Sequence, residues 1–278
     1  MTERTGRWPA VGRAAALLLL LASCVPRPSG IAPLAGSPRS TRYLAQLNRR
    51  QQRAVMVEEA ATIWPRGRAG CDTCPMRRLP GAQANLVFSW PALFRLRVDS
   101  VFGTAFDLGL AGDSLTVYAP ALRAGVALSA VRDSLQVSNP GSLVVRLLTA
   151  AWRPPEAAWT RAAWEGASLV LRWSESGDSV VVAVDDHGRP AWARLGRDAG
   201  RGIHVAYERW EMVDGVAWPV TLRVRSLGGE FELASRIARV KFGASADSLR
   251  LAVRIPDDAD RFEPDRLRRL LQRVEPVR

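Results

Sequence analysis

The amino-acid sequence predicts a mainly β protein with helices (α+β), built on one antiparallel sheet of about ten strands. Three observations lead to this prediction. Apolar and polar residues alternate in successive runs between residues 84 and 242, as in strands that bury one face. Turn residues such as Asp-Gly and Gly-Gly separate several of these runs. Two stretches, near the start and in the middle, instead carry apolar residues at helical spacing.

Residues 1–23 are predicted to be a lipoprotein signal peptide. Arginines precede the apolar run Ala14–Ala22, whose nine residues are too few for a bilayer core, which needs about 20. The run leads into Leu-Ala-Ser-Cys24, which resembles the lipobox of bacterial lipoproteins. The resemblance implies an acyl anchor on Cys24. Because Val25 follows and not Asp, it also implies an outer-membrane anchor on the periplasmic side. The alternative is an ordinary signal peptide with a Cys by chance.

The rest of the chain divides into three parts. Residues 24–40 are rich in Pro, Gly and Ser and predict a flexible tether. Residues 41–255 suit a single β domain, and residues 256–278 a C-terminal amphipathic helix. The formal charge of +12 would suit nucleic acid, but the arginines alternate along strands, so we expect no nucleic-acid partner. Anionic lipid headgroups are a more plausible use of the charge.

The first element after the tether is an expected helix over Thr41–Glu59, with a mixed apolar and polar face. Cys71 and Cys74 follow, in a C-x-x-C spacing that can be redox-active, bind zinc or form a local disulfide. We favour the disulfide. No βαβ pattern surrounds the pair, and the two histidines of the chain lie far away without ligand spacing.

The hairpin over residues 93–119 is the clearest strand signal. Its apolar positions alternate with Arg, Asp and Gly, and they are Phe94, Leu96, Val98, Phe106, Leu108, Leu110, Leu115 and Val117. The first turn, Val101-Phe102-Gly103, places two bulky apolar residues where Asn, Asp and Gly are usual. We therefore expect this turn to contact something apolar.

The remaining elements follow the same criteria. Helical spacing predicts a helix over Ser142–Trp152, a further helical turn over Glu156–Trp164 and a terminal helix over Pro264–Val274. In the last strand the apolar set shifts register, which predicts a β-bulge near Arg236–Ala238. The other expected strands are 84–90, 122–129, 168–173, 179–185, 190–195, 202–212, 216–227 and 230–242.

The pattern from residue 84 to residue 242 resembles the lipoprotein-sorting proteins of the LolA/LolB family, most closely the LolB-type receptor. The resemblance lies in Trp90, the run Phe94–Val98, the turn at Val101–Thr104, the mid-chain helix, and residues 181–195, 205–210 and 214–219. It implies a curved, incomplete antiparallel β-barrel whose open side is closed by helices, around a dry cavity for acyl chains.

The resemblance also implies two sets of site residues. A membrane-insertion loop would consist of Val101, Phe102 and Gly103, with Phe102 as the residue that helps to deliver cargo. The acyl-chain cavity would be lined by Phe94, Leu96, Val98, Phe106, Leu108, Leu110, Val117, Leu147 and Tyr207. For Phe94, Leu96, Phe106 and Leu108 the alternative is ordinary core, which is the more common role of any single such residue.

Enzymatic motifs are missing from the sequence, so we expect no enzyme, no cofactor and no metal. Asp185-Asp186-His187 could act as an acid–base cluster, but it is also good turn chemistry. Two functions remain. The first is an outer-membrane lipoprotein that binds acyl chains of lipids or lipoproteins and inserts lipoproteins, acting as a monomer with a periplasmic carrier as partner. The second is an assembly lipoprotein that uses the same fold as a platform for proteins.

Overall fold

The protein is described by a computed structural model over residues 37–68, 76–78, 80–100, 103–111, 114–129, 140–196, 202–229, 231–243 and 251–263. Within these residues, fifteen strands form one open sheet and three α-helices accompany it. The helices are α2 (Pro38–Arg53), α3 (Pro140–Thr149) and α4 (Glu156–Thr160). The prediction of a mostly β protein is confirmed, but the count of about ten strands is wrong.

The sheet consists of two antiparallel meanders that meet at one strand pair. The first meander holds β1 (Val57–Arg68), β2 (Met76–Arg78), β3 (Ala82–Ser89), β4 (Leu93–Ser100), β5 (Gly103–Ala111), β6 (Ser114–Ala119) and β7 (Ala124–Ser129). The second holds β8 (Ala163–Glu165), β9 (Ser168–Glu175), β10 (Asp178–Val184), β11 (Pro190–Gly196), β12 (Gly202–Val213), β13 (Val216–Ser226) and β14 (Phe231–Phe242). β1 pairs with β14 and so joins the two meanders, and β15 (Asp260–Arg261) adds a short parallel pair beside β7.

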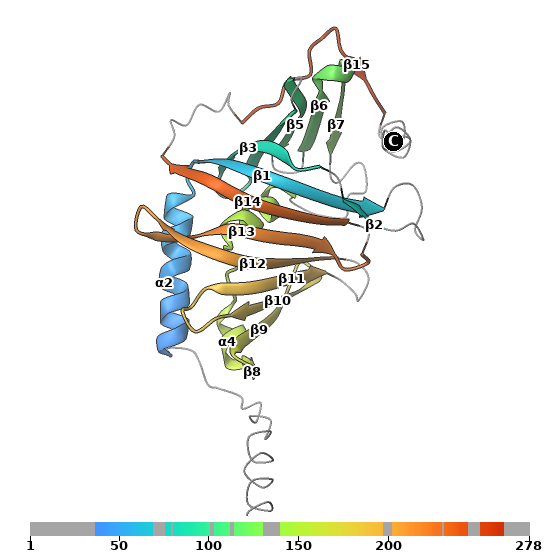
Figure 1. Cartoon of the computed structure of the whole chain (residues 1–278). Coiled ribbons are helices and arrows are strands. Elements are labelled where there is room, and N and C mark those ends of the chain that lie inside the picture. The colour runs from blue at the N-terminus through green and yellow to red at the C-terminus, as the bar shows by residue number, and fades with distance from the viewer. Residues whose placement is uncertain are drawn as a thin grey trace, which may run out of the picture.

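This topology explains where the helices lie. The chain leaves β7 near one end of the sheet and re-enters it at β8 at the other end, with α3 and α4 in between. α3 contacts β4, β5 and β13, so it crosses one face of the sheet. α2 contacts β13 and runs at a steep angle to the strands, while β5–β7 turn steeply away from the direction of β1 and β14 (Figure 1).

The face of the sheet that α2 and α3 cover, here called the inner face, carries the core. One apolar cluster joins Tyr43 and Leu47 of α2 to the strands of the second meander. A second cluster joins Val145 and Leu148 of α3 to strands β1, β3, β4, β5, β13 and β14. The opposite, outer face carries most of the charged side chains of the alternating strands, as the sequence pattern predicts.

The first helix is shorter than the sequence predicts. It begins after Ser37, whose Oγ accepts a hydrogen bond from Ser40 N at 3.2 Å, and it ends at Arg53. The prediction of helix up to Glu59 is therefore wrong, because Val57 already opens β1. Val57, Glu59, Ala61 and Ile63 form the buried side of this strand. A glutamate at a buried position hides the apolar–polar alternation that would otherwise have identified the strand.

The sequence predicts eleven individual strands, three in the hairpin and eight elsewhere, so four of the fifteen strands have no counterpart in the prediction. They are β1, which follows the first helix directly, and the short strands β2, β8 and β15. The expected helical turn over Glu156–Trp164 ends at Thr160, and Ala163–Glu165 pairs with β9. Strands of two or three residues are too short to show a period, so the sequence gives no signal for them.

Several local predictions are confirmed. The mid-chain helix is α3, over Pro140–Thr149. Asp214 and Gly215 both have positive φ, as a tight hairpin turn requires. In the β1–β14 pair Ala60 lies opposite Arg239 and Ala61 opposite Ile237, so Ala238 is the extra residue of a β-bulge at the predicted place.

Residues 251–263 form a strap against the outer face of β5–β7. An added Cβ on Gly109 would lie 2.9 Å from Val253, and one on Gly125 would lie 2.8 Å from Ile255, so both glycines leave room for the strap. Residues 256–263 contain a turn and β15 and no helix, so this part of the stretch expected to be helical belongs to the sheet. The expected helix Pro264–Val274 lies outside the described residues.

Candidate functional site

A row of apolar residues crosses the inner face of the first meander. Leu86, Leu96, Leu108, Val117 and Val126 are successive cross-strand neighbours on β3 to β7. Directly opposite residues in an antiparallel pair project to the same face, so the five side chains share it. With strands about 4.8 Å apart, the row spans roughly 19 Å. This length suits a long acyl chain laid across the strands.

The middle of this row is only partly covered. Leu86 and Val126 are 6% and 3% exposed, whereas Leu96, Leu108 and Val117 are half-buried. Phe106 on β5 and Leu115 on β6 are half-buried as well, and both pairings place them on the inner face, opposite Val98 and Leu110. We call these five half-buried residues, Leu96, Phe106, Leu108, Leu115 and Val117, the inner patch. An apolar surface of this kind can accept an apolar guest.

The predicted cavity residues fall into two groups, five that are half-buried and four that are buried. Leu96, Phe106, Leu108 and Val117 belong to the inner patch, and Leu147 is half-buried on α3. The other four are closely packed core, with 4% to 7% of their surface exposed: Phe94, Val98, Leu110 and Tyr207.

Tyr207 is fixed by polar contacts as well as by packing. Its hydroxyl donates to the Leu147 carbonyl at 3.0 Å and accepts from the Trp152 indole N–H at 2.8 Å. Burial raises the pKa of the Tyr207 hydroxyl above its ordinary value. The residue therefore links β12 to the C-terminal end of α3 and is not part of an open surface.

Of the other predicted site residues, the structure describes only Gly103. Cys24, Cys71, Cys74, Val101 and Phe102 lie outside the described residues. Gly103 is exposed and has a φ of 111°. It pairs with Ser100, whose hydroxyl donates to the Gly103 carbonyl at 3.0 Å. Gly103 therefore belongs to β5, whereas the sequence analysis placed it in the turn with Val101 and Phe102.

Sequence reasoning missed a buried carboxyl on the inner face. Glu59 is 2% exposed and lies between Leu86 and Val240 in the sheet. Its Oε1 accepts the Trp218 indole N–H at 2.7 Å, and its Oε2 has no hydrogen-bond partner in the structure. Burial raises the pKa of Glu59 to about 8, and the hydrogen bond from Trp218 opposes part of that rise. The carboxyl is therefore mostly neutral at pH 7.

A buried cation on α2 is a second feature that the sequence did not reveal. Arg50 is fully buried, donates to the Ala150 carbonyl at 3.4 Å and lies over the Trp210 ring at 5.2 Å. Burial lowers the pKa of Arg50 to about 10. Arg50 joins α2 to the end of α3, so the two helices that cover the inner face are held to each other.

The acidic cluster at residues 185–187 forms the turn between β10 and β11. The Asp185 carboxylate accepts from Arg189 N at 2.7 Å and Nε at 3.0 Å, while the side chains of Asp186 and His187 are exposed.

Among the residues that the structure describes, no group of three or more His, Cys, Asp or Glu is placed to hold a metal ion. No helix within the described ranges has the length and apolar character needed to span a membrane.

Comparison with known proteins gives only distant similarities. No protein-family model and no curated protein matches the chain. A LolA superfamily protein from Nitrosomonas europaea is 12% identical with a TM-score of 0.44, covering 76% of this chain and 97% of that one. A lipoprotein-sorting protein domain from Vibrio parahaemolyticus is 12% identical with a TM-score of 0.45, covering 84% and 97%. A DUF1329 family protein from Desulfovibrio piger is 10% identical with a TM-score of 0.47, covering 78% and 98%.

These likenesses concern the overall shape of the chain and do not say what it binds. All three TM-scores lie below 0.5, so these likenesses assign the chain to no family, and the resemblance to a LolB-type receptor stays a prediction. The function has to come from the chain's own residues.

Proposed function

We propose that the protein is an exported, membrane-tethered lipoprotein that binds acyl chains of lipids or lipoproteins on the inner patch and catalyses no reaction. The inner patch carries this proposal. These five apolar residues are neighbours on β4, β5 and β6 and remain half-buried, whereas most inner-face residues of the adjacent strands β1 and β3 are buried. Removing apolar surface from water is favourable at about 25 cal/mol per Å², so an acyl chain is a suitable occupant.

The remaining parts of the proposal rest on the sequence. An acyl anchor on Cys24 would hold the protein at the periplasmic side of the outer membrane. A periplasmic carrier would deliver cargo to a monomer, and the helices would limit access to the inner patch. In this scheme the hairpin turn at Val101–Gly103 inserts into the membrane during transfer.

A second function is supported by a different observation. Phe94, Val98, Leu110 and Tyr207, four of the nine residues expected to line a cavity, are packed core. A sheet filled by its own side chains would suit a rigid platform for protein partners. The two functions differ in whether lipid binds at all.

Lipid binding can be tested with the full chain carrying Cys24→Ser, which cannot receive the anchor. Native mass spectrometry should find co-purified lipid, and a fluorescent fatty acid should bind. In the same chain, Leu108→Gln should weaken fatty-acid binding about tenfold, since a fully buried Leu contributes about 1.5–3 kcal/mol. The matched control is Leu122→Gln, because Leu122 is 68% exposed and lies outside the inner patch. An apo mass with no uptake of the fatty acid would favour the platform.

A further inference from the structure

A basic hollow lies on the outer face, on the side of the sheet away from the inner patch. It occupies about 270 Å³ over β14, β1, β3 and β4. Two cross-strand rows form it: Arg239, Ala60, Asn85 and Arg97 in one, and Lys241, Glu58, Val87 and Arg95 in the other. Four cations therefore stand at the corners of a floor made of Ala60, Asn85, Glu58 and Val87. Lys241 is the only lysine of the chain.

The two cations on β4 already have partners. Arg95 holds Asp107 through two hydrogen bonds, with Nε at 2.9 Å and a terminal nitrogen at 2.5 Å from the carboxylate. Arg97 donates to the Thr104 hydroxyl at 2.8 Å and lies 3.5 Å from Asp99. These contacts fix both arginines along the rim of the hollow.

The two cations on β14, Arg239 and Lys241, differ from the two on β4 in their ion pairs. Among the ion pairs of the described residues, none includes Arg239 or Lys241, and both side chains are exposed. Glu58, opposite Lys241 in the register, is the only carboxylate of the hollow that the pairing places on the outer face, because Glu59 is turned inward to Trp218. Within the part of the chain that the structure describes, the hollow therefore keeps an excess of positive charge, because Glu58 can offset only one of the two cations on β14.

The basic hollow continues into a second depression over β4–β6. This depression occupies about 470 Å³, shares Arg95 and Arg97 with the first, and adds Arg254 from the strap. Among the described residues, those that line the basic hollow include no aromatic side chain, and the adjoining depression has one, Tyr118. Nucleic-acid sites that do not read sequence usually provide aromatic faces for base stacking, so the hollow is better suited to a phosphate group than to a nucleotide.

We propose that the basic hollow binds the phosphate headgroup of an anionic phospholipid, with Arg239 and Lys241 as its principal ligands. The expected site thus lies on the opposite face from the acyl-binding patch. With the outer face against the headgroups, the inner patch would open away from the membrane, where incoming cargo could reach it. The inference does not depend on lipid binding at the inner patch, since only headgroup charge is recognised here.

The experiment is vesicle binding by the full chain carrying Cys24→Ser, so that no acyl anchor contributes. Vesicles that contain phosphatidylglycerol should bind the protein, and vesicles of pure phosphatidylcholine should not. Each basic residue near an anionic surface contributes a factor of about five in affinity, so Arg239→Gln with Lys241→Gln should weaken binding about 30-fold. Both side chains are exposed, so the double variant should keep its melting temperature.

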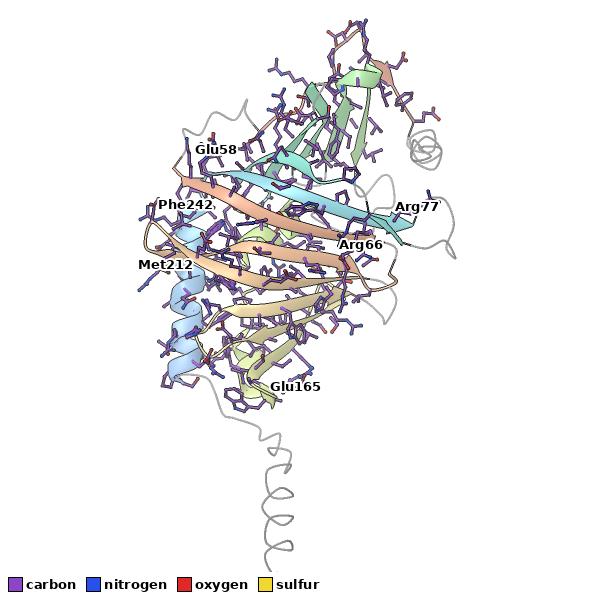
Figure 2. The ribbon with its side chains drawn as sticks, viewed as in Figure 1. Glu58, Arg66, Arg77, Glu165, Met212 and Phe242 are labelled. Carbon is purple, nitrogen blue, oxygen red and sulfur yellow. The ribbon has the colours of Figure 1, made fainter. Side chains whose placement is uncertain are left out.

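The matched control is Arg77→Gln with Arg78→Gln, which removes the same charge from exposed positions on β2. Arg77 lies at the opposite end of β1 from Glu58 and Phe242 (Figure 2). This control should weaken binding less than fivefold. Equal losses in both double variants would show a general charge effect and overturn the proposal.

A further arm uses inorganic phosphate as competitor, at an ionic strength matched with chloride. Phosphate should compete only weakly, because a headgroup in a membrane presents many charges at once. If the chain binds inorganic phosphate through Arg239 and Lys241 but does not bind the vesicles, the site recognises a soluble anion and the lipid assignment is wrong.

Discussion

Replacing the buried carboxyl of Glu59 by the amide of Gln should change how the stability of the protein depends on pH. In the folded protein the Glu59 pKa is about 8, against an ordinary value of 4.5. Between these values the folded protein holds a proton that the unfolded chain has released. The contribution of Glu59 to the free energy of unfolding is therefore fully present below about pH 4.5 and decreases as the pH rises towards about 8. Above about pH 8 this group causes no further decrease.

The size of the effect follows from the same two pKa values. Each pH unit between them corresponds to about 1.4 kcal/mol, so the loss from this one side chain amounts to about 5 kcal/mol. That is a large part of the 5–15 kcal/mol that stabilises a typical domain. In Glu59→Gln the amide oxygen can still accept the Trp218 N–H, but the side chain no longer titrates. The variant should lack this fall in stability.

The measurement is urea unfolding followed by circular dichroism at intervals from about pH 5 to about pH 8. Other groups titrate in this range, so the contribution of the carboxyl is the difference in the free energy of unfolding between the wild type and Glu59→Gln at each pH. Glu58→Gln is the control, since the register places Glu58 on the outer face of the same strand. If the free energy of unfolding changes with pH in the same way for the wild type and Glu59→Gln, the reasoning is refuted. Such a result would mean that the carboxyl is ionised in the folded protein.

Two further predictions concern the strap and the hairpin turn. Gly125→Ala should loosen the strap, because the new Cβ would lie 2.8 Å from Ile255; the melting temperature should fall by several degrees and proteolysis within 251–263 should increase. Adding Ile255→Ala should restore part of the loss, and no recovery would mean that the strap is not what the alanine disturbs. Phe102→Glu should impair delivery of cargo into membranes while the melting temperature stays unchanged. A fall of many degrees would instead identify Phe102 as core.

The local features of this fold could be predicted from the sequence. Alternation placed the hairpin strands at residues 93–119 and the bulge near Ala238, and the Asp214-Gly215 turn followed from residue type alone. These features depend on residues that are close together in the chain, where side-chain period and turn chemistry act directly. The predicted lipobox at Cys24 likewise rests on the sequence alone, because Cys24 lies outside the described residues.

Only the tertiary structure decided how much of the apolar face stays open. α3 packs on β4 and β5, where Phe94, Val98 and Leu110 are buried with Val145 and Leu148, while Leu96 and Leu108 on the same strands remain half-buried. The sequence analysis placed Glu59 at the end of a helix, and its burial in β1 depends on strands far away in the sequence. Alternation shows which face of a strand is apolar, but coverage by distant elements determines whether that face is core or a binding surface.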